Sequence, residues 1–141
     1  MAVGELCLKE GLYKLAAVRI FIVDDSQAWR RAVCSILRQH LDLEIVCESS
    51  DGLDAVRKSE ELRPDLILLD IGLPTLNGLE AARQIRKVSP SSRILFLTSY
   101  DSPDLLQEAL RIGALGFVVK SNAACDLLPA VKAVMQDEQF F

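Results

Sequence analysis

Five short apolar runs recur along the chain from residue 18 onward, and segments with a different hydrophobic spacing separate them. The runs are rich in aliphatic and β-branched residues and are bounded by polar or structure-breaking residues, which is typical of strands in a buried sheet. The predicted strands are VRIFIV (18–23), LEIVCES (43–49), LILLD (66–70), RILFLTS (93–99) and GFVVK (116–120).

Between these runs, apolar residues recur every three or four positions, as on one face of an amphipathic helix. Trp29, Val33 and Leu37 form such a stripe in the first segment. Strands that alternate with helices of about 10 to 15 residues indicate right-handed crossovers and a parallel sheet. The predicted fold class is α/β, with a doubly wound, five-stranded parallel sheet and helices on both faces. Helices are predicted over residues 26–40, 52–62, 78–88, 103–113 and 125–136.

Pro129 interrupts the last helical segment. A proline inside a helix removes a backbone hydrogen bond and clashes with the preceding turn. The helix therefore either starts near Asp126, with Pro129 in its first turn, or is kinked at Pro129. We expect the late start, with Asp126 as the N-cap residue.

The chain has 141 residues, of which 50% are hydrophobic and 26% are charged, and this balance indicates one globular domain. We expect that domain to span residues 18–141. Residues 1–17 contain two glycines and are predicted to be an N-terminal extension. The extension either forms a short amphipathic helix or stays loose.

Sixteen basic and twenty acidic residues are spread along the chain and give a net charge of −4. This distribution does not indicate a surface for nucleic acid or anionic lipid. The apolar runs are too short to span a membrane, and the first 18 residues lack the pattern of a signal peptide, so we expect a cytoplasmic protein. The four cysteines form no CxxC pair, which argues against a zinc site or a disulfide framework.

Charged and hydroxyl side chains stand where the predicted strands end. Asp24 and Asp25 end the first strand, Asp70 the third, Thr98 the fourth and Lys120 the fifth. Ligand sites of open parallel sheets form beyond the carboxyl ends of the strands, so these side chains should converge at one edge. Carboxylates without histidine make an oxygen site that suits Mg²⁺. Beside a divalent ion and a lysine, one carboxylate can act as a nucleophile toward a phosphoryl group.

Each of these residues also has an ordinary structural interpretation. Asp24 or Asp25 alone could cap the first helix, and Asp70 could cap a turn. Lys120 could be a simple ion-pair partner of Asp70. The convergence of the whole set on one edge favours a site over a series of unrelated structural roles.

Four stretches together resemble the receiver domains of two-component response regulators. They are FIVDDS, DLILLDIGLPTLNGLE, ILFLTSY and GALGFVVK, and the similarity runs from about residue 19 to residue 136. The resemblance implies a flavodoxin-like sheet with strand order 2-1-3-4-5. It also implies a signalling domain that is not an enzyme acting on a separate substrate, although it assists its own phosphorylation and dephosphorylation.

The resemblance further implies the chemistry of the acidic edge. Asp70 would accept a phosphoryl group from the phosphohistidine of a sensor histidine kinase. Asp25, Asp70 and the backbone carbonyl of Gly72 would ligate Mg²⁺, while Asp24 would act through a metal-bound water. A glycine at position 72 would leave the pocket more open to water.

The same resemblance implies a switch. Lys120 would contact the phosphoryl group, Thr98 would move to donate a hydrogen bond to it, and Phe117 would rotate inward as Thr98 moves. Phosphorylation would then favour one arrangement of the fourth and fifth strand ends. The surface formed by residues 103–113, the fifth strand and the last helix would transmit that change to a partner or to a second copy of the chain in a homodimer.

The ending LLPAVKAVMQDEQFF resembles the receiver half of LuxR-type transcription regulators, in which a linker and a helix-turn-helix domain follow. We expect DNA binding to belong to such a domain, absent from this chain, with transcription as the output. The alternative is a stand-alone receiver that acts through protein contacts or in a phosphorelay.

Two other classes of protein fit the sequence less well. A haloacid-dehalogenase-like phosphatase also uses a carboxylate nucleophile and Mg²⁺, but its DxDxT motif is replaced here by DDSQAW after the first strand. A flavin-binding flavodoxin needs a glycine- and hydroxyl-rich phosphate loop at that place, where this chain is acidic.

Overall fold

A computed structural model of the protein describes residues 17–141. The predicted extension therefore lies almost wholly outside the described residues, and the division at residue 18 stays a prediction. Strands occupy β1 (Val18–Val23), β2 (Leu43–Ser49), β3 (Leu66–Leu69), β4 (Arg93–Thr98) and β5 (Gly116–Val119). Helices occupy α1 (Gln27–Leu37), α2 (Gly52–Leu62), α3 (Gly78–Val88), α4 (Pro103–Ile112) and α5 (Ala123–Met135), with a 3₁₀ turn η1 (Lys120–Asn122) before α5.

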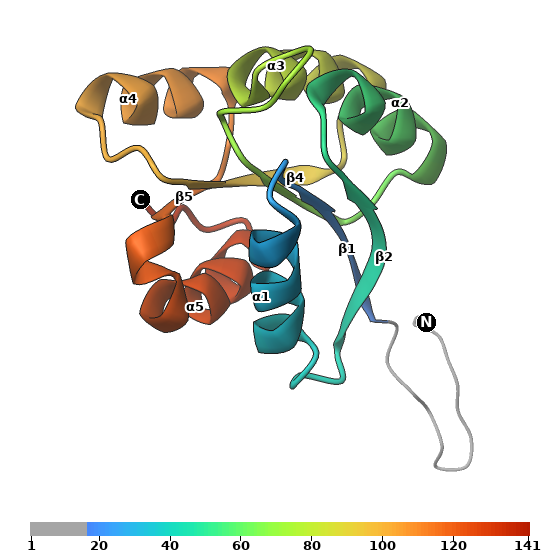
Figure 1. Ribbon diagram of the computed structural model, residues 1–141, viewed down its shortest axis with the longest axis vertical. Coiled ribbons are helices and arrows are strands. Elements are labelled where there is room, and N and C mark those ends of the chain that lie inside the picture. The colour runs from blue at the N-terminus through green and yellow to red at the C-terminus, as the bar shows by residue number, and fades with distance from the viewer. Residues whose placement is uncertain (1–16) are drawn as a thin grey trace.

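The strands form one parallel sheet in the order β2-β1-β3-β4-β5, as predicted. Helices α1 and α5 cover one face of this sheet, and α2, α3 and α4 cover the other (Figure 1). The chain reverses its direction of winding after β2, so the carboxyl ends of β1 and β3 become neighbours at the centre of the sheet. This topology places Asp24 beside Asp70.

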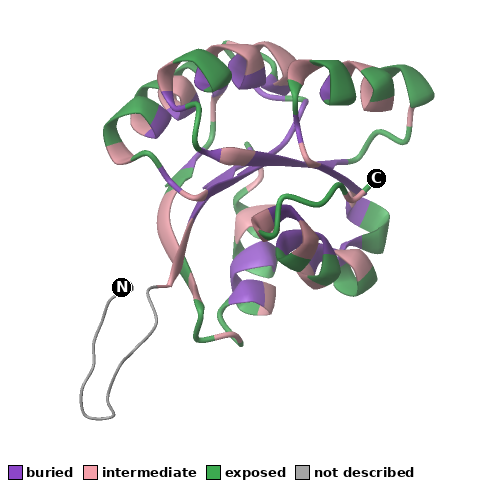
Figure 2. Cartoon of the chain, turned by 180° about the vertical axis from the view of Figure 1, so that it is seen from behind, coloured by how far each residue is buried: buried purple, intermediate pink, exposed green. Residues whose placement is uncertain are grey.

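Strand residues alternate between two cores, because successive side chains of a strand point to opposite faces. On β1, Ile20 and Ile22 face α1 and α5, while Phe21 and Val23 face the other three helices. Both faces of β3 are fully buried, which explains why its sequence, LILL, is uninterrupted by polar residues. The buried strands form the central layer of Figure 2.

The predicted late start of the last helix is wrong. Helix α5 begins at Ala123, directly after η1, and Pro129 lies inside it. The N-cap residue is Asn122, not Asp126. Ala123 and Leu127 are buried in the core, so packing of the first two turns against the sheet outweighs the hydrogen bond that Pro129 cannot donate.

Cys34, Cys47 and Cys125 are free thiols in the part of the chain that the structure describes. None of the helices in residues 17–141 combines the length and the apolar character that crossing a membrane requires.

Candidate functional site

Three carboxylates meet at the carboxyl ends of β1 and β3. Asp24, Asp25 and Asp70 each offer an oxygen atom, and these atoms lie within 4.8 Å of one another. Asp24 and Asp70 are buried, whereas Asp25 is exposed to solvent. The structure thus brings together the three acids that the sequence predicted to converge.

The first helix has its own cap, so Asp24 and Asp25 are not needed for that role. Ser26 is the N-cap residue of α1, and its hydroxyl accepts a hydrogen bond from the Trp29 backbone N–H. One carboxylate oxygen of Asp24 accepts from the Ser26 N–H at 2.9 Å. Arg30, from the same helix, donates to the backbone carbonyl of Asp24 at 2.6 Å. The start of α1 therefore fixes the position of Asp24.

Lys120 binds both buried carboxylates. Its ammonium lies 2.6 Å from an oxygen of Asp24 and 3.3 Å from an oxygen of Asp70, and its side chain is 7% exposed. The sequence suggested Asp70 as the partner, and the closer contact with Asp24 was missed. One buried cation thus neutralises part of the charge of two buried anions, which is the arrangement that makes such groups tolerable inside a protein.

Burial raises the pKa of the Asp70 carboxyl above its ordinary value, and the negative charge of Asp24 raises it further. The Lys120 ammonium and a hydrogen bond from the Ile71 N–H to Asp70, 2.8 Å long, act in the opposite direction without cancelling the rise. The ionised form of Asp70 is therefore disfavoured in the folded protein.

This raised pKa predicts a pH dependence of the unfolding free energy. Folded Asp70 binds more protons than unfolded Asp70, so its contribution to stability is greatest below the ordinary pKa of about 4 and is lost as pH rises through the raised pKa. Asp70→Asn should remove this loss. In denaturant titrations without metal, the variant should gain stability over the wild type as pH rises from 4 to 7, and a difference independent of pH would contradict the assignment.

Thr98 is the last residue of β4, and Phe117 lies on the adjoining strand β5. Thr98 is fully buried, and its hydroxyl accepts a hydrogen bond from the Tyr100 N–H at 3.2 Å. Phe117 is buried in the core between the sheet and helices α2, α3 and α4. Its ring stacks on that of Phe141, with 6.5 Å between centroids, and its N–H donates to the Phe140 carbonyl. The contact of Phe117 with the end of the chain was not predicted.

Gly78 positions Asp70 and was missed by the sequence analysis. The Gly78 N–H, at the start of α3, donates to the Ile71 carbonyl at 2.7 Å. A β-carbon on Gly78 would lie 2.0 Å from the Asp70 carbonyl oxygen, where no side chain fits. The sequence shows a glycine directly after Asn77, the N-cap residue of α3, but the close approach of Gly78 to Asp70 is visible only in the structure.

Gly78→Ala should therefore be destabilising although alanine favours helices. We expect a loss of about 1–3 kcal/mol, typical of overpacking, with weaker metal binding as the Asp70 backbone moves. Gly72→Ala is the control, because its β-carbon would meet the Tyr100 ring at 3.6 Å, an ordinary contact. Denaturant unfolding of both variants measures the difference; equal stabilities would show that the approach of α3 does not position Asp70.

The acidic cluster fits a divalent cation by its chemistry. Its donor atoms are all carboxylate oxygens, which suit Mg²⁺, and the pKa of Asp70 is raised by burial and by the negative charge of Asp24. Among the residues described, these three form the one such group of ligating side chains. Zinc, which prefers histidine and cysteine ligands, is a poor match.

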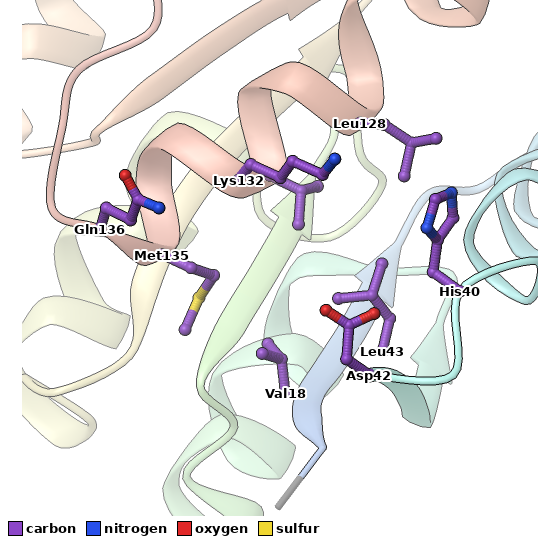
Figure 3. Close-up of a pocket in the computed structure, with 9 residues that line it drawn as sticks. Val18, His40, Asp42, Leu43, Leu128, Lys132, Met135 and Gln136 are labelled. Atoms are coloured by element: carbon purple, nitrogen blue, oxygen red, sulfur yellow. The ribbon is translucent and has the colours of Figure 1, made fainter. Parts of the chain in front are cut away.

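A separate pocket of about 170 Å³ lies at the other end of the sheet (Figure 3). In Figure 3, side chains of α5 face those of the β1 start and the loop that leads into β2. Because ligands of open α/β sheets bind at the carboxyl ends of the strands, this pocket is not the candidate site. Its lining residues are Val18, His40, Asp42, Leu43, Leu128, Val131, Lys132, Met135 and Gln136.

A family model described as the response regulator receiver domain matches residues 20–132. Among curated proteins, the response regulator protein VraR of Staphylococcus saprophyticus is 32% identical over 124 residues, which cover 88% of this chain and 59% of VraR. The chain thus spans about three fifths of the length of this relative.

Solved structures show the same likeness. A two-component response regulator of the LuxR family from Aurantimonas superimposes with a TM-score of 0.85 at 29% identity, covering 89% of this chain and 90% of that one. CheY from Borrelia burgdorferi, in a complex described as CheX-CheY-BeF3-Mg, gives a TM-score of 0.80 at 25% identity, covering 84% and 90% of the two chains.

Proposed function

The chain belongs to the response regulator receiver domain family, and on that premise we propose that it accepts a phosphoryl group on Asp70 from a sensor histidine kinase. The observation that carries the proposal is the contact of one buried lysine with two buried carboxylates, Asp24 and Asp70, beside the exposed Asp25. A haloacid-dehalogenase-like phosphatase or a flavodoxin would need motifs that the chain lacks.

The covalent step uses one carboxylate oxygen of Asp70. This oxygen forms a bond to phosphorus while the bond between phosphorus and the phosphohistidine nitrogen breaks, and the imidazole keeps the electron pair. The product is an acyl phosphate on Asp70. No co-reactant is consumed, because the kinase supplies the phosphoryl group and the carboxylate needs no base.

Asp25, Asp70 and the Gly72 carbonyl are proposed to hold Mg²⁺, and Asp24 to act through a metal-bound water. The ion, when bound, would neutralise charge on the phosphoryl oxygens. The mutual distances of the three carboxylate oxygens support this assignment, as does the metal-containing complex named for the Borrelia CheY structure.

Lys120 and Thr98 are proposed to act on the phosphoryl oxygens after transfer. The Lys120 ammonium already lies 3.3 Å from Asp70, so a small shift would carry it to a phosphoryl oxygen. The Thr98 hydroxyl would exchange its bond with Tyr100 for a bond to that group. Phe117 would then turn inward, away from Phe141, which couples phosphorylation to the surface of α4, β5 and α5.

This surface is the proposed site for a partner or for a second copy of the chain in a homodimer. The output is proposed to be transcription, through a DNA-binding domain outside this chain, as the likeness to a LuxR-family regulator suggests. A stand-alone receiver that acts by protein contacts is the alternative. In either case we propose a cytoplasmic signalling domain that turns over no separate substrate.

The direct test of this proposal is intact-mass measurement after incubation with acetyl phosphate. One phosphoryl adduct should form with Mg²⁺ and should not form when EDTA is present from the start. Hydroxylamine, which cleaves acyl phosphates, should remove the adduct. An adduct that resists hydroxylamine would place the phosphoryl group on a hydroxyl side chain and refute the proposal.

A further inference from the structure

The indole ring of Trp29 contacts the buried lysine of the acidic site. The Lys120 ammonium lies over this ring, 5.1 Å from its centroid. Trp29 is the third residue of α1 and is half-buried against the core formed with α5. A lysine ammonium within about 6 Å of a tryptophan face is attracted by the ring's electrons, more strongly where water is excluded.

The Lys120 ammonium therefore has three neighbours of two kinds. Asp24 and Asp70 hold it by charge, and Trp29 holds it by its π-face. In the proposed function Asp24 contacts a metal-bound water, and Asp70 ligates the ion and accepts the phosphoryl group. Trp29 has neither role, so its contact with the Lys120 ammonium does not depend on what the two carboxylates bind.

We propose that Trp29 is a positioning residue, which keeps the Lys120 ammonium at the wall of the acidic pocket through its π-face. The inference rests on the proposed function of Lys120 and adds a residue that the sequence analysis had assigned only to an apolar helix stripe. The start of α1 thus has two roles: Ser26 and Arg30 fix Asp24, and Trp29 fixes its cationic partner.

Two substitutions separate the π-face from apolar packing. Trp29→Leu keeps an apolar side chain and loses the ring, while Trp29→Phe keeps a smaller ring. With acetyl phosphate and Mg²⁺, the Leu variant should be phosphorylated about 5- to 30-fold more slowly than the wild type, and the Phe variant should stay within about 3-fold. Equal rates for the Leu and Phe variants would overturn the proposal.

A double-mutant cycle shows whether Trp29 acts through Lys120. In a Lys120→Met background, Trp29→Leu should cause no further slowing, because the cation it positions is gone. If Trp29→Leu slowed both backgrounds by the same factor, its role would be general packing and the proposal would fail. Ile36→Ala, elsewhere on α1 and against the same core, is the control for a loss of apolar contact and should leave the rate unchanged.

A second readout needs neither metal nor phosphoryl donor. Trp29 is the single tryptophan of the chain, so its fluorescence reports on the ring alone. In metal-free protein, Lys120→Met should change the emission intensity, and Ile36→Ala should not. If Lys120→Met changes the emission but the wild type is never phosphorylated, the proposed function is refuted while the positioning of Lys120 by Trp29 stands. If Lys120→Met leaves the emission unaltered, the positioning of Lys120 by Trp29 is refuted.

Discussion

Asp70→Asn is expected to abolish the hydroxylamine-labile phosphoryl adduct, so that intact-mass measurement after acetyl phosphate treatment shows background only. The physical reason is that an amide oxygen is a poor nucleophile toward phosphorus, whereas the buried Asp70 carboxylate faces the Lys120 ammonium that can neutralise the incoming oxygens. The fold should survive, because Asn has the shape of Asp and removes one charge from a crowded pocket.

The matched control for this substitution is Asp42→Asn. Asp42 is exposed and lies at the opposite end of the sheet, beside the pocket against α5, so the same chemical change there should leave the adduct at the wild-type yield. If Asp70→Asn formed the adduct at the wild-type yield, another residue would be the phosphoryl acceptor and the assignment of Asp70 would be wrong.

Magnesium should raise the free energy of unfolding of the wild type by about 2.7 kcal/mol at 100 times its dissociation constant, if it binds only the folded chain. Asp25→Asn should remove most of this increment, because it deletes a carboxylate whose oxygen lies within 4.8 Å of those of Asp24 and Asp70. Without metal, the variant should be at least as stable as the wild type, since Ser26, not Asp25, caps α1.

Thermal melts of both proteins with and without Mg²⁺, at constant ionic strength, measure this effect. Glu44→Gln is the control, because Glu44 is an exposed acid on β2 outside the cluster and its loss should leave the increment intact. An undiminished increment in Asp25→Asn would mean that Asp25 does not hold the ion.

The fold was predictable because the hydrophobic residues of the strands and helices recur in the sequence with the spacing typical of each element. LILL in β3 could be a doubly buried parallel strand, and the structure buries it fully. The start of α5 was not predictable, because proline at position 129 argues locally for a later start. Burial of Ala123 and Leu127 decides the outcome, and burial depends on the whole sheet.

The part of the candidate site that depends only on the topology of the sheet was predictable. Asp24, Asp70 and Lys120 end strands that the parallel sheet brings to one edge, so their convergence followed from the fold class. The nearer partner of Lys120 was not predictable, because its ammonium reaches both carboxylates and the two distances, 2.6 Å to Asp24 and 3.3 Å to Asp70, differ little. Gly78 and Trp29 were missed because each matters through one close contact, with Asp70 and with Lys120, and such a contact appears only once the elements are packed.

The central claim, that Asp70 carries the phosphoryl group, is tested most directly by trapping the acyl phosphate with borohydride and mapping the product by peptide mass spectrometry. Hydride reduces the acyl carbon and releases phosphate, so the modified residue becomes homoserine. We expect homoserine at position 70 alone, in protein treated with acetyl phosphate and Mg²⁺. Homoserine at position 24 or 25, or its absence from a protein that carries the adduct, would contradict the account.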